Sequence, residues 1–293
     1  MGENPRSRNR PPRWIALSIL PIITLAALFA AGCGINVGPT QEVTIDEPLT
    51  GAAITDVELS MGAGKLFVSP GAAGLVSGSI RYNVEPWKPE VTRDEDSVAI
   101  KQGSQKGISG LGTDIDNTWN LHLGAAPIRL KVTAGAYEGT YDLSGLTLLG
   151  LSIKDGAAKT QVIFNSPNPG QIDRFTYGTG ASTVTMAGLA NANFKNMEFT
   201  GGAGSYSLDF SGDLRTDASV RVEAGVGTVV LRVPKQTAAS VTVSGSLTDV
   251  DVEGPWSSAG KTHSTPAAAG KGSGKMLTIT VDMSVGSLKL ITE

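Results

Sequence analysis

The residues with the clearest chemical potential are acidic side chains that alternate along one stretch near the C-terminus. Asp249, Asp251 and Glu253 occupy every second position. In a β-strand such side chains project from one face, and carboxylate oxygens are the ligands that Ca²⁺ prefers. Trp256 follows closely and has an aromatic face on which the C–H groups of a sugar could stack. These four residues form the candidate ligand face, although a solvated acidic strand is the simpler interpretation of the carboxylates.

Other residues with catalytic or metal-binding potential fit known motifs poorly. Two further acidic clusters, at residues 94–96 and 114–117, do not continue into an EF-hand loop with its glycine and distal glutamate. The only histidines are His122, in a strand-like segment, and His263, in a low-complexity segment, and neither lies in a nucleophile motif. The sequence therefore predicts no catalytic residue, no metal site and no cofactor, and the protein is not expected to be an enzyme.

The segment VRVEAGVGTVVLRV, residues 220–233, contains a Gly-Val-Gly that resembles part of a phosphate-binding loop. Such a loop needs Gly-x-Gly-x-x-Gly between a strand and a helix, because the helix N-terminus and free amides hold the phosphates. Gly227 is followed instead by a strand-like run with no third glycine at the required place. Gly225 and Gly227 are therefore predicted to form a tight corner between two strands, with Val226 facing the core.

This corner recurs along the chain at intervals of 21 to 24 residues. Apolar and polar residues alternate on both sides of each corner, which is the period of a strand with one buried face. Two apolar columns and one corner column align the units: Leu59, Val132, Ile153, Phe175, Phe199, Val222, Val243 and Val281; Val68, Tyr141, Val162, Val184, Leu208, Leu231, Val252 and Leu290; Ala63, Ala136, Ala157, Thr179, Ala203, Val226, Leu247 and Val285. In this alignment Asp173 occupies an apolar slot, which indicates a bulge or shift near Ile172.

The repeats predict an all-β fold. Two strands joined by a glycine corner, repeated about eight times, are typical of a β-solenoid or a closely related stacked β array. The β domain is expected to span residues 51–293. Within it, residues 71–126 are expected to form a capping sheet at the N-terminal end, because an open sheet edge invites aggregation, and residues 254–275 a flexible loop. Residues 34–50 are expected to be a tether.

Residues 1–33 differ in composition from the rest of the chain. Four arginines precede an uncharged apolar stretch at residues 14–31, and the small residues Ala30, Ala31 and Gly32 directly precede Cys33. This resembles a bacterial lipoprotein signal peptide, with Cys33 as the lipid acceptor. The alternative is an uncleaved hydrophobic helix near the lower length limit for a membrane span. Both interpretations predict attachment to the cell membrane with the β domain on the extracytoplasmic side.

The composition limits both the partners and the means of stabilisation. The chain has 24 Lys and Arg against 27 Asp and Glu, a net charge of −3, and removal of the arginine-rich leader would make it more acidic. Nucleic-acid binding requires a basic face and is not expected. With one cysteine there is no internal disulfide, so stability must come from packing.

Several segments resemble the bacterial toast-rack proteins, among them VELSMGAGKLFVSPG, IRYNVEPWKPEV, VRVEAGVGTVVLRVP and VDMSVGSLKL. That group is a domain of unknown function, similar to the extracytoplasmic part of cell-wall-antibiotic-response membrane proteins and to β-helical domains of adhesin type. The resemblance spans residues 54–290. It implies an envelope-facing structural or sensory module, and the family has no assigned catalytic residues.

Together these features predict a lipid-anchored extracytoplasmic β-repeat protein that acts as a non-catalytic binding, adhesion or envelope-stress module. Its expected partners are the membrane, through the anchor, and an envelope protein or glycan. The alternative is a glycan-binding or glycan-cleaving protein of the cell envelope, with the acidic strand and Trp256 as its site.

Overall fold

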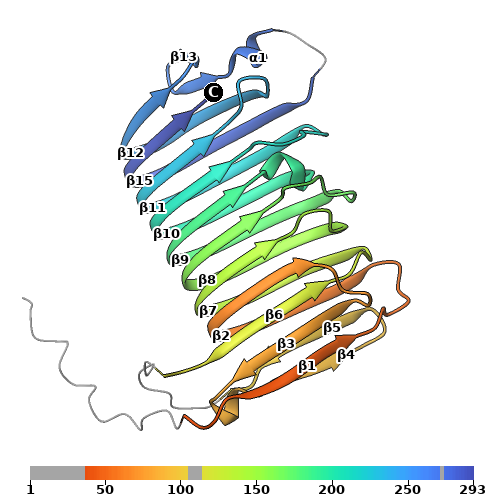
Figure 1. Cartoon of the computed structure of the whole chain (residues 1–293). Coiled ribbons are helices and arrows are strands. Elements are labelled where there is room, and N and C mark those ends of the chain that lie inside the picture. Colours follow the sequence, from red (N-terminus) through yellow and green to blue (C-terminus); the bar gives the residue numbers. More distant parts are fainter. Residues whose placement is uncertain (1–36, 105–113, 271–273) are drawn as a thin grey trace, which may run out of the picture.

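The computed structural model of the protein describes residues 37–104, 114–270 and 274–293. In these ranges the protein is an elongated all-β structure with a 15-stranded sheet (Figure 1). The predicted signal peptide or anchor, residues 1–33, and its lipidation site Cys33 lie outside the described residues. Within the described ranges, no helix combines the length and the apolar character needed to cross a membrane.

Eight long strands of 15 or 16 residues make up most of the described structure. They are β2 (Thr55–Pro70), β7 (Ile128–Asp142), β8 (Leu148–Ile163), β9 (Ile172–Ala187), β10 (Phe194–Asp209), β11 (Ala218–Arg232), β12 (Ala238–Glu253) and β15 (Met276–Ile291). Each bends near its middle into two arms, and the bent strands stack in parallel along the long axis (Figure 1). The expected all-β array of stacked repeats is therefore present.

The alternating sequence of β11 explains how one unit contributes to the core. Val220, Val222 and Leu231 are buried, whereas Arg221 and Arg232 are exposed. A single unit cannot cover its own apolar face, so the parallel neighbours on both sides supply the contacts. Burial of each such side chain stabilises the fold by roughly 1.5 to 3 kcal/mol.

The corners differ from the prediction in one respect. Val226 is 54% exposed and Val285 is 43% exposed, so these corner residues face solvent and not the core. The flanking glycines are required because successive corners stack closely. A Cβ on Gly227 would lie 1.9 Å from the carbonyl oxygen of Gly204, and one on Gly225 would lie 2.5 Å from that of Gly202. Gly227 also has a φ of +141°, a conformation that residues with a side chain rarely adopt.

Strand β9 corrects the predicted repeat alignment. Phe199 of β10 pairs with Tyr177, two residues beyond the Phe175 that the alignment predicts. The rings of Tyr177 and Phe199 stack with centroids 5.5 Å apart. The displacement continues through the unit, with Ala181 in place of Thr179 at the corner and Met186 in place of Val184 in the second arm.

The corrected register also accounts for Asp173. Phe175 fills the apolar slot that was assigned to Asp173, because it pairs with Leu151 on one side and Met197 on the other. Asp173 lies before this slot, is exposed, and forms an ion pair with Lys195 at 2.9 Å. The apolar column is therefore continuous through β9.

Short strands cover the N-terminal end of the stack. They are β1 (Gln41–Glu47), β3 (Val76–Tyr82), β4 (Pro89–Arg93), β5 (Ser97–Gln102) and β6 (Asn117–Leu123), with a 3₁₀ turn at Glu85–Trp87. Strand β5 pairs with the first arm of β2 and β6 with its second arm, while β3 joins β6 to β1. The region expected to cap the stack, residues 71–126, thus supplies four of these strands, and the expected tether, residues 34–50, contains β1.

The C-terminal end has a crossover that the repeat order does not predict. Strand β15 lies between β11 and β12, so β12 becomes the last long strand of the stack. Residues 254–275, expected to be a flexible loop, contain β13 (Ser257–Ala259), β14 (Thr262–Ser264) and the short helix α1 (Pro266–Ala269) in their described part. Strand β14 pairs with the first arm of β12, at Ser240–Thr242, and with β13.

Candidate functional site

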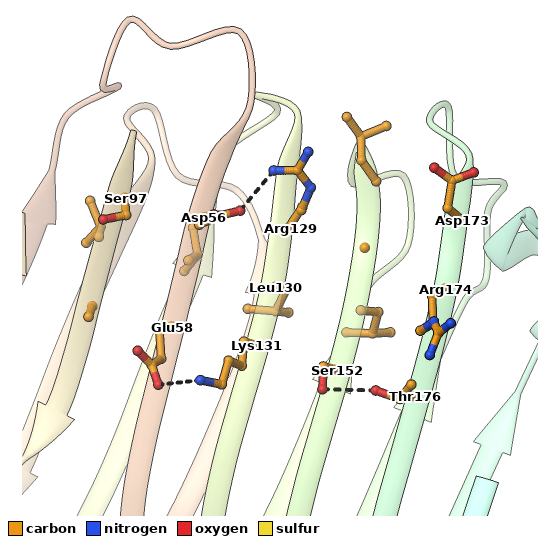
Figure 2. A pocket seen from close by; sticks show the side chains of 16 residues that line it. Asp56, Glu58, Ser97, Arg129, Leu130, Lys131, Ser152, Asp173, Arg174 and Thr176 are labelled. Carbon is orange, nitrogen blue, oxygen red and sulfur yellow. Dashed lines mark hydrogen bonds and ion pairs between the residues drawn. The ribbon is translucent and has the colours of Figure 1, made fainter. Parts of the chain in front are cut away.

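A groove of about 650 Å³ crosses the outer face of the first arms, over β5, β2, β7, β8 and β9 (Figure 2). Two rows of outward side chains line it, one residue from each strand in each row. The first row is Ser97, Asp56, Arg129, Gly150 and Arg174; the second is Ala99, Glu58, Lys131, Ser152 and Thr176. The residues on β5 and β8 are small, whereas those on β2 and β7, which lie between these two strands, have longer side chains. This difference in length forms the groove.

Over β8 the groove forms a depression that we call the basic hollow. Its floor is Gly150 and Ser152; Arg129 and Lys131 of β7 lie on one side and Arg174 of β9 on the other (Figure 2). At the edge of the floor, the hydroxyl of Thr176 donates a hydrogen bond to that of Ser152 at 2.9 Å. The hollow therefore combines three cationic side chains with two hydroxyl groups, and Asp173 of β9, which also lines the groove, is paired with Lys195.

Carboxylates of β2 hold two of these cations in place. Arg129 forms an ion pair with Asp56 at 3.3 Å, and Lys131 forms one with Glu58 at 3.0 Å (Figure 2). The hydrogen bond from Lys131 contributes most to lowering the pKa of Glu58 below its usual value. All four side chains are partly exposed, so each pair stabilises the fold by only about 0 to 1 kcal/mol. In the described part of the chain, Arg174 has no ion-pair partner.

The predicted ligand face lies elsewhere, on the second arm of β12. Asp251 and Glu253 share one cation, Lys289 of the neighbouring β15, with Asp251 at 3.7 Å. Asp249 is exposed farther along the same arm, where it pairs in register with Ser287. Across the described ranges, no group of three or more His, Cys, Asp or Glu side chains is arranged to hold a metal ion. The carboxylates therefore occupy an edge strand next to a lysine, and their role in binding stays a prediction.

Trp256 is not brought onto the same surface as the carboxylates. Its ring packs against the hydrophobic core, and its indole N–H is buried without a hydrogen-bond partner among the described residues. Three further large aromatic residues, Tyr82, Trp87 and Trp119, are buried in the N-terminal part of the described structure. The hydroxyl of Tyr82 donates to Gln41, and the indole of Trp119 donates to Asn117, both at 2.9 Å.

Both histidines pair with a serine. Nδ1 of His122 lies 2.8 Å from the hydroxyl oxygen of Ser69, and Nδ1 of His263 lies 2.8 Å from that of Ser258. Burial lowers the pKa of His263. Neither histidine has a carboxylate partner in the residues that the structure describes, so neither pair is completed to a triad.

Asp155 of β8 is an inward-facing acidic residue that was not among the candidates predicted from the sequence. Its carboxylate accepts hydrogen bonds from the hydroxyl of Tyr177 at 2.6 Å and from that of Thr179. Tyr137 lies nearby, with its hydroxyl 2.9 Å from that of Tyr141. The available signal was the alternation in β8, which places Asp155 on the same side as Ile153. This network is internal and does not open into the groove.

All five tyrosines of the chain are buried, and this predicts a high-pH transition. Burial raises the pKa of Tyr137 to about 12 and also raises the pKa of the other four, Tyr82, Tyr141, Tyr177 and Tyr206. Because folding raises these pKa values, the folded state keeps its full stability below pH 10, where unfolded tyrosines stay neutral. This stability is lost as the pH rises from there through the folded-state pKa values. From Tyr137 alone the loss is roughly 3 kcal/mol.

Absorbance at 295 nm and denaturant melts between pH 8 and pH 13 check this prediction. We expect little tyrosinate in the folded protein at pH 10.5, and ionisation that coincides with unfolding at higher pH. The urea-unfolded protein, as the control, should titrate near pH 10. A folded protein whose tyrosines ionise at pH 10 would contradict the packing described for this cluster.

One family model matches about half of the chain. The family model described as the N-terminal domain of toast_rack, DUF2154, matches residues 36–184. No curated protein matches the chain.

Solved structures resemble the chain at low identity. A candidate cell adhesion protein from Clostridium sporogenes is 21% identical, with 87% of this chain and 100% of that chain covered and a TM-score of 0.49. A candidate adhesin from Bacteroides fragilis is 12% identical, with coverages of 89% and 100% and a TM-score of 0.33. A candidate adhesin from Parabacteroides merdae is 9% identical, with coverages of 88% and 98% and a TM-score of 0.34.

Proposed function

The chain belongs to the toast-rack family, and from that premise we propose that it is a non-catalytic binding module of the bacterial cell envelope. The observation that carries the proposal is the groove over β5, β2, β7, β8 and β9. The side chains that line the groove project from parallel strands whose inner faces are packed into the core. The spacing of these strands therefore fixes the positions from which the outward side chains project. Such an open, regular surface suits an extended partner that lies across the strands.

The proposal places this module outside the cytoplasm. Its support is the sequence of the N-terminal segment, in which basic residues, an apolar stretch and small residues precede Cys33. A lipid on Cys33, or an uncleaved hydrophobic helix, would hold the β domain close to the membrane. The groove would then face other components of the envelope.

The binding role is tested with the full chain in non-ionic detergent against a panel of envelope polysaccharides and envelope proteins. We expect saturable binding that Ser152→Met weakens at least tenfold, because the longer, uncharged side chain fills the floor of the groove. Gln161→Met, which places the same side chain on the other arm of β8, is the matched control and should bind like the parent.

The same panel also tests the alternative of glycan cleavage. Release of shorter glycan products that Asp251→Ala removes would overturn the non-catalytic proposal and assign chemistry to the β12 carboxylates. Binding that both Ser152→Met and Gln161→Met leave unchanged would mean that the binding surface lies outside the groove.

A further inference from the structure

The centre of the basic hollow is open because the residue there, Gly150, has no side chain. Arg129 and Arg174 lie on the strands either side of Gly150, so their Cα atoms are roughly 10 Å apart at ordinary strand spacing. A Cβ on Gly150 would lie only 3.3 Å from Cγ of Arg129, whose stem therefore passes close over the glycine. Any side chain at this position would crowd the stem of Arg129 and fill the space between β7 and β9 over Gly150.

The charge around the hollow is positive, although the chain as a whole is acidic. Arg129, Lys131 and Arg174 all border it, while the carboxylates of Asp56 and Glu58 lie on the far side of β7 (Figure 2). Glu58 is also shared with Lys101, at 3.2 Å. The third carboxylate that lines the groove, Asp173 of β9, is paired with Lys195 at 2.9 Å. Each carboxylate of the groove thus has a cationic partner, whereas Arg174 has no ion-pair partner among the described residues.

These groups match the chemistry of an oxyanion. Guanidinium groups present paired N–H donors that fit carboxylate and phosphate oxygens, and the hydroxyls of Ser152 and Thr176 can add further hydrogen bonds. Arg129 and Lys131 would have to exchange Asp56 and Glu58 for the incoming anion. Each partly exposed ion pair is worth only about 0 to 1 kcal/mol, so the exchange costs little. Arg174 needs no such exchange among the described residues.

The shape of the groove indicates what carries the anion. The groove is open and continues over five strands, a span of roughly 19 Å. An extended chain with repeated negative groups can lie along such a surface, whereas a single small anion would occupy only the hollow.

We propose that the basic hollow binds the carboxylate or phosphate groups of an anionic envelope polysaccharide that lies across the strands. This inference deepens the proposed binding function and rests on it. The matched charge pattern, and not sequence-specific contact with a protein, is what selects the partner.

The test measures binding of the full chain in non-ionic detergent to polygalacturonate, to inorganic polyphosphate and to neutral dextran. We expect binding to at least one polyanion, none to dextran, and at least a tenfold loss of affinity in Arg174→Gln. Lys159→Gln removes the same charge from the exposed other arm of β8 and should lose less than twofold. Both variants must keep the thermal unfolding temperature of the parent, which is expected because both positions are exposed.

Other outcomes overturn the inference in distinguishable ways. Equal losses in the two variants would indicate attraction to overall charge without a site. Binding to neutral polysaccharides that Arg174→Gln leaves intact would overturn the oxyanion inference and leave the proposed function standing. As a further probe, mixed detergent micelles that contain phosphatidylglycerol are measured, and a preference for them over both polyanions would make the anion a lipid headgroup. Absence of binding to every polysaccharide and protein probe would overturn both proposals.

Discussion

The variant Leu231→Asp is expected to lose cooperative folding, whereas Arg232→Asp, one residue along the same strand, is expected to fold like the parent. Leu231 is fully buried and pairs in register with Leu208 and Leu290 on the adjacent strands. An aspartate there would place a carboxylate among apolar side chains with no partner, at a cost of several kcal/mol. It would also remove roughly 1.5 to 3 kcal/mol of apolar burial. Because a domain is stable by only about 5 to 15 kcal/mol, the combined loss is enough to unfold it.

Arg232→Asp is the matched control for Leu231→Asp. It lies on the same strand, its side chain faces solvent, and its replacement introduces the same aspartate. Urea unfolding followed by circular dichroism measures both variants, and we expect a cooperative transition for Arg232→Asp only. Similar midpoints for the two variants would mean that β11 does not bury its alternate residues in the register described.

The alternation of residues was sufficient to predict the class of the fold but not every register. In β11 the sequence places Val222 and Leu231 correctly, as their pairing with Phe199 and Leu208 confirms. In β9 the predicted alignment is wrong by two residues. A shift of two preserves the inward and outward alternation, so the apolar pattern cannot distinguish the two alignments. Only contact with the neighbouring strands selects Tyr177 over Phe175.

The alternation of apolar and polar residues could not predict the exposure of the corner residues or the order of strands β12 and β15. At a corner the backbone changes direction, so an apolar residue such as Val226 can follow the apolar column and still face solvent. Strands β12 and β15 carry the same alternation, and nothing in their spacing shows that β15 inserts next to β11. The acidic arm of β12 suits the outer position, because charged side chains on an edge strand discourage pairing with another chain. Asp249 and its neighbours thus have a structural explanation that the sequence alone did not supply.

The basic hollow could not have been predicted from motifs. Arg129, Gly150 and Arg174 are more than twenty residues apart from one another, and each is unremarkable in its own repeat. They come together because β7, β8 and β9 are adjacent and because the corrected register of β9 sets Arg174 beside Gly150. The candidate ligand face was predictable only because its carboxylates lie on one strand.

The corner glycines support a second prediction with a large effect, the variant Gly227→Ala. The added methyl group would lie 1.9 Å from the carbonyl oxygen of Gly204, which belongs to the backbone of the adjacent corner and cannot move alone. The residue would also keep a φ near +141°, which alanine adopts only under strain. We expect a loss of about 2 to 4 kcal/mol in the free energy of unfolding, measured by urea denaturation.

Gly178→Ala is the matched control for Gly227→Ala, because it makes the same substitution in β9 without either cause of strain. The nearest atom to its added methyl group is Cγ of Lys154, at 4.0 Å, and its φ is not in the left-handed region. Its stability should stay the same or rise by about 0.5 kcal/mol, since alanine restricts the unfolded chain more than glycine does. If Gly227→Ala were as stable as Gly178→Ala, the corners would have to be stacked less closely than described. We expect a large difference between the two variants because Gly225 and Gly227 allow one corner to stack closely on the next. The backbone of the adjacent corner therefore fills the space that a phosphate would need at Gly225 and Gly227.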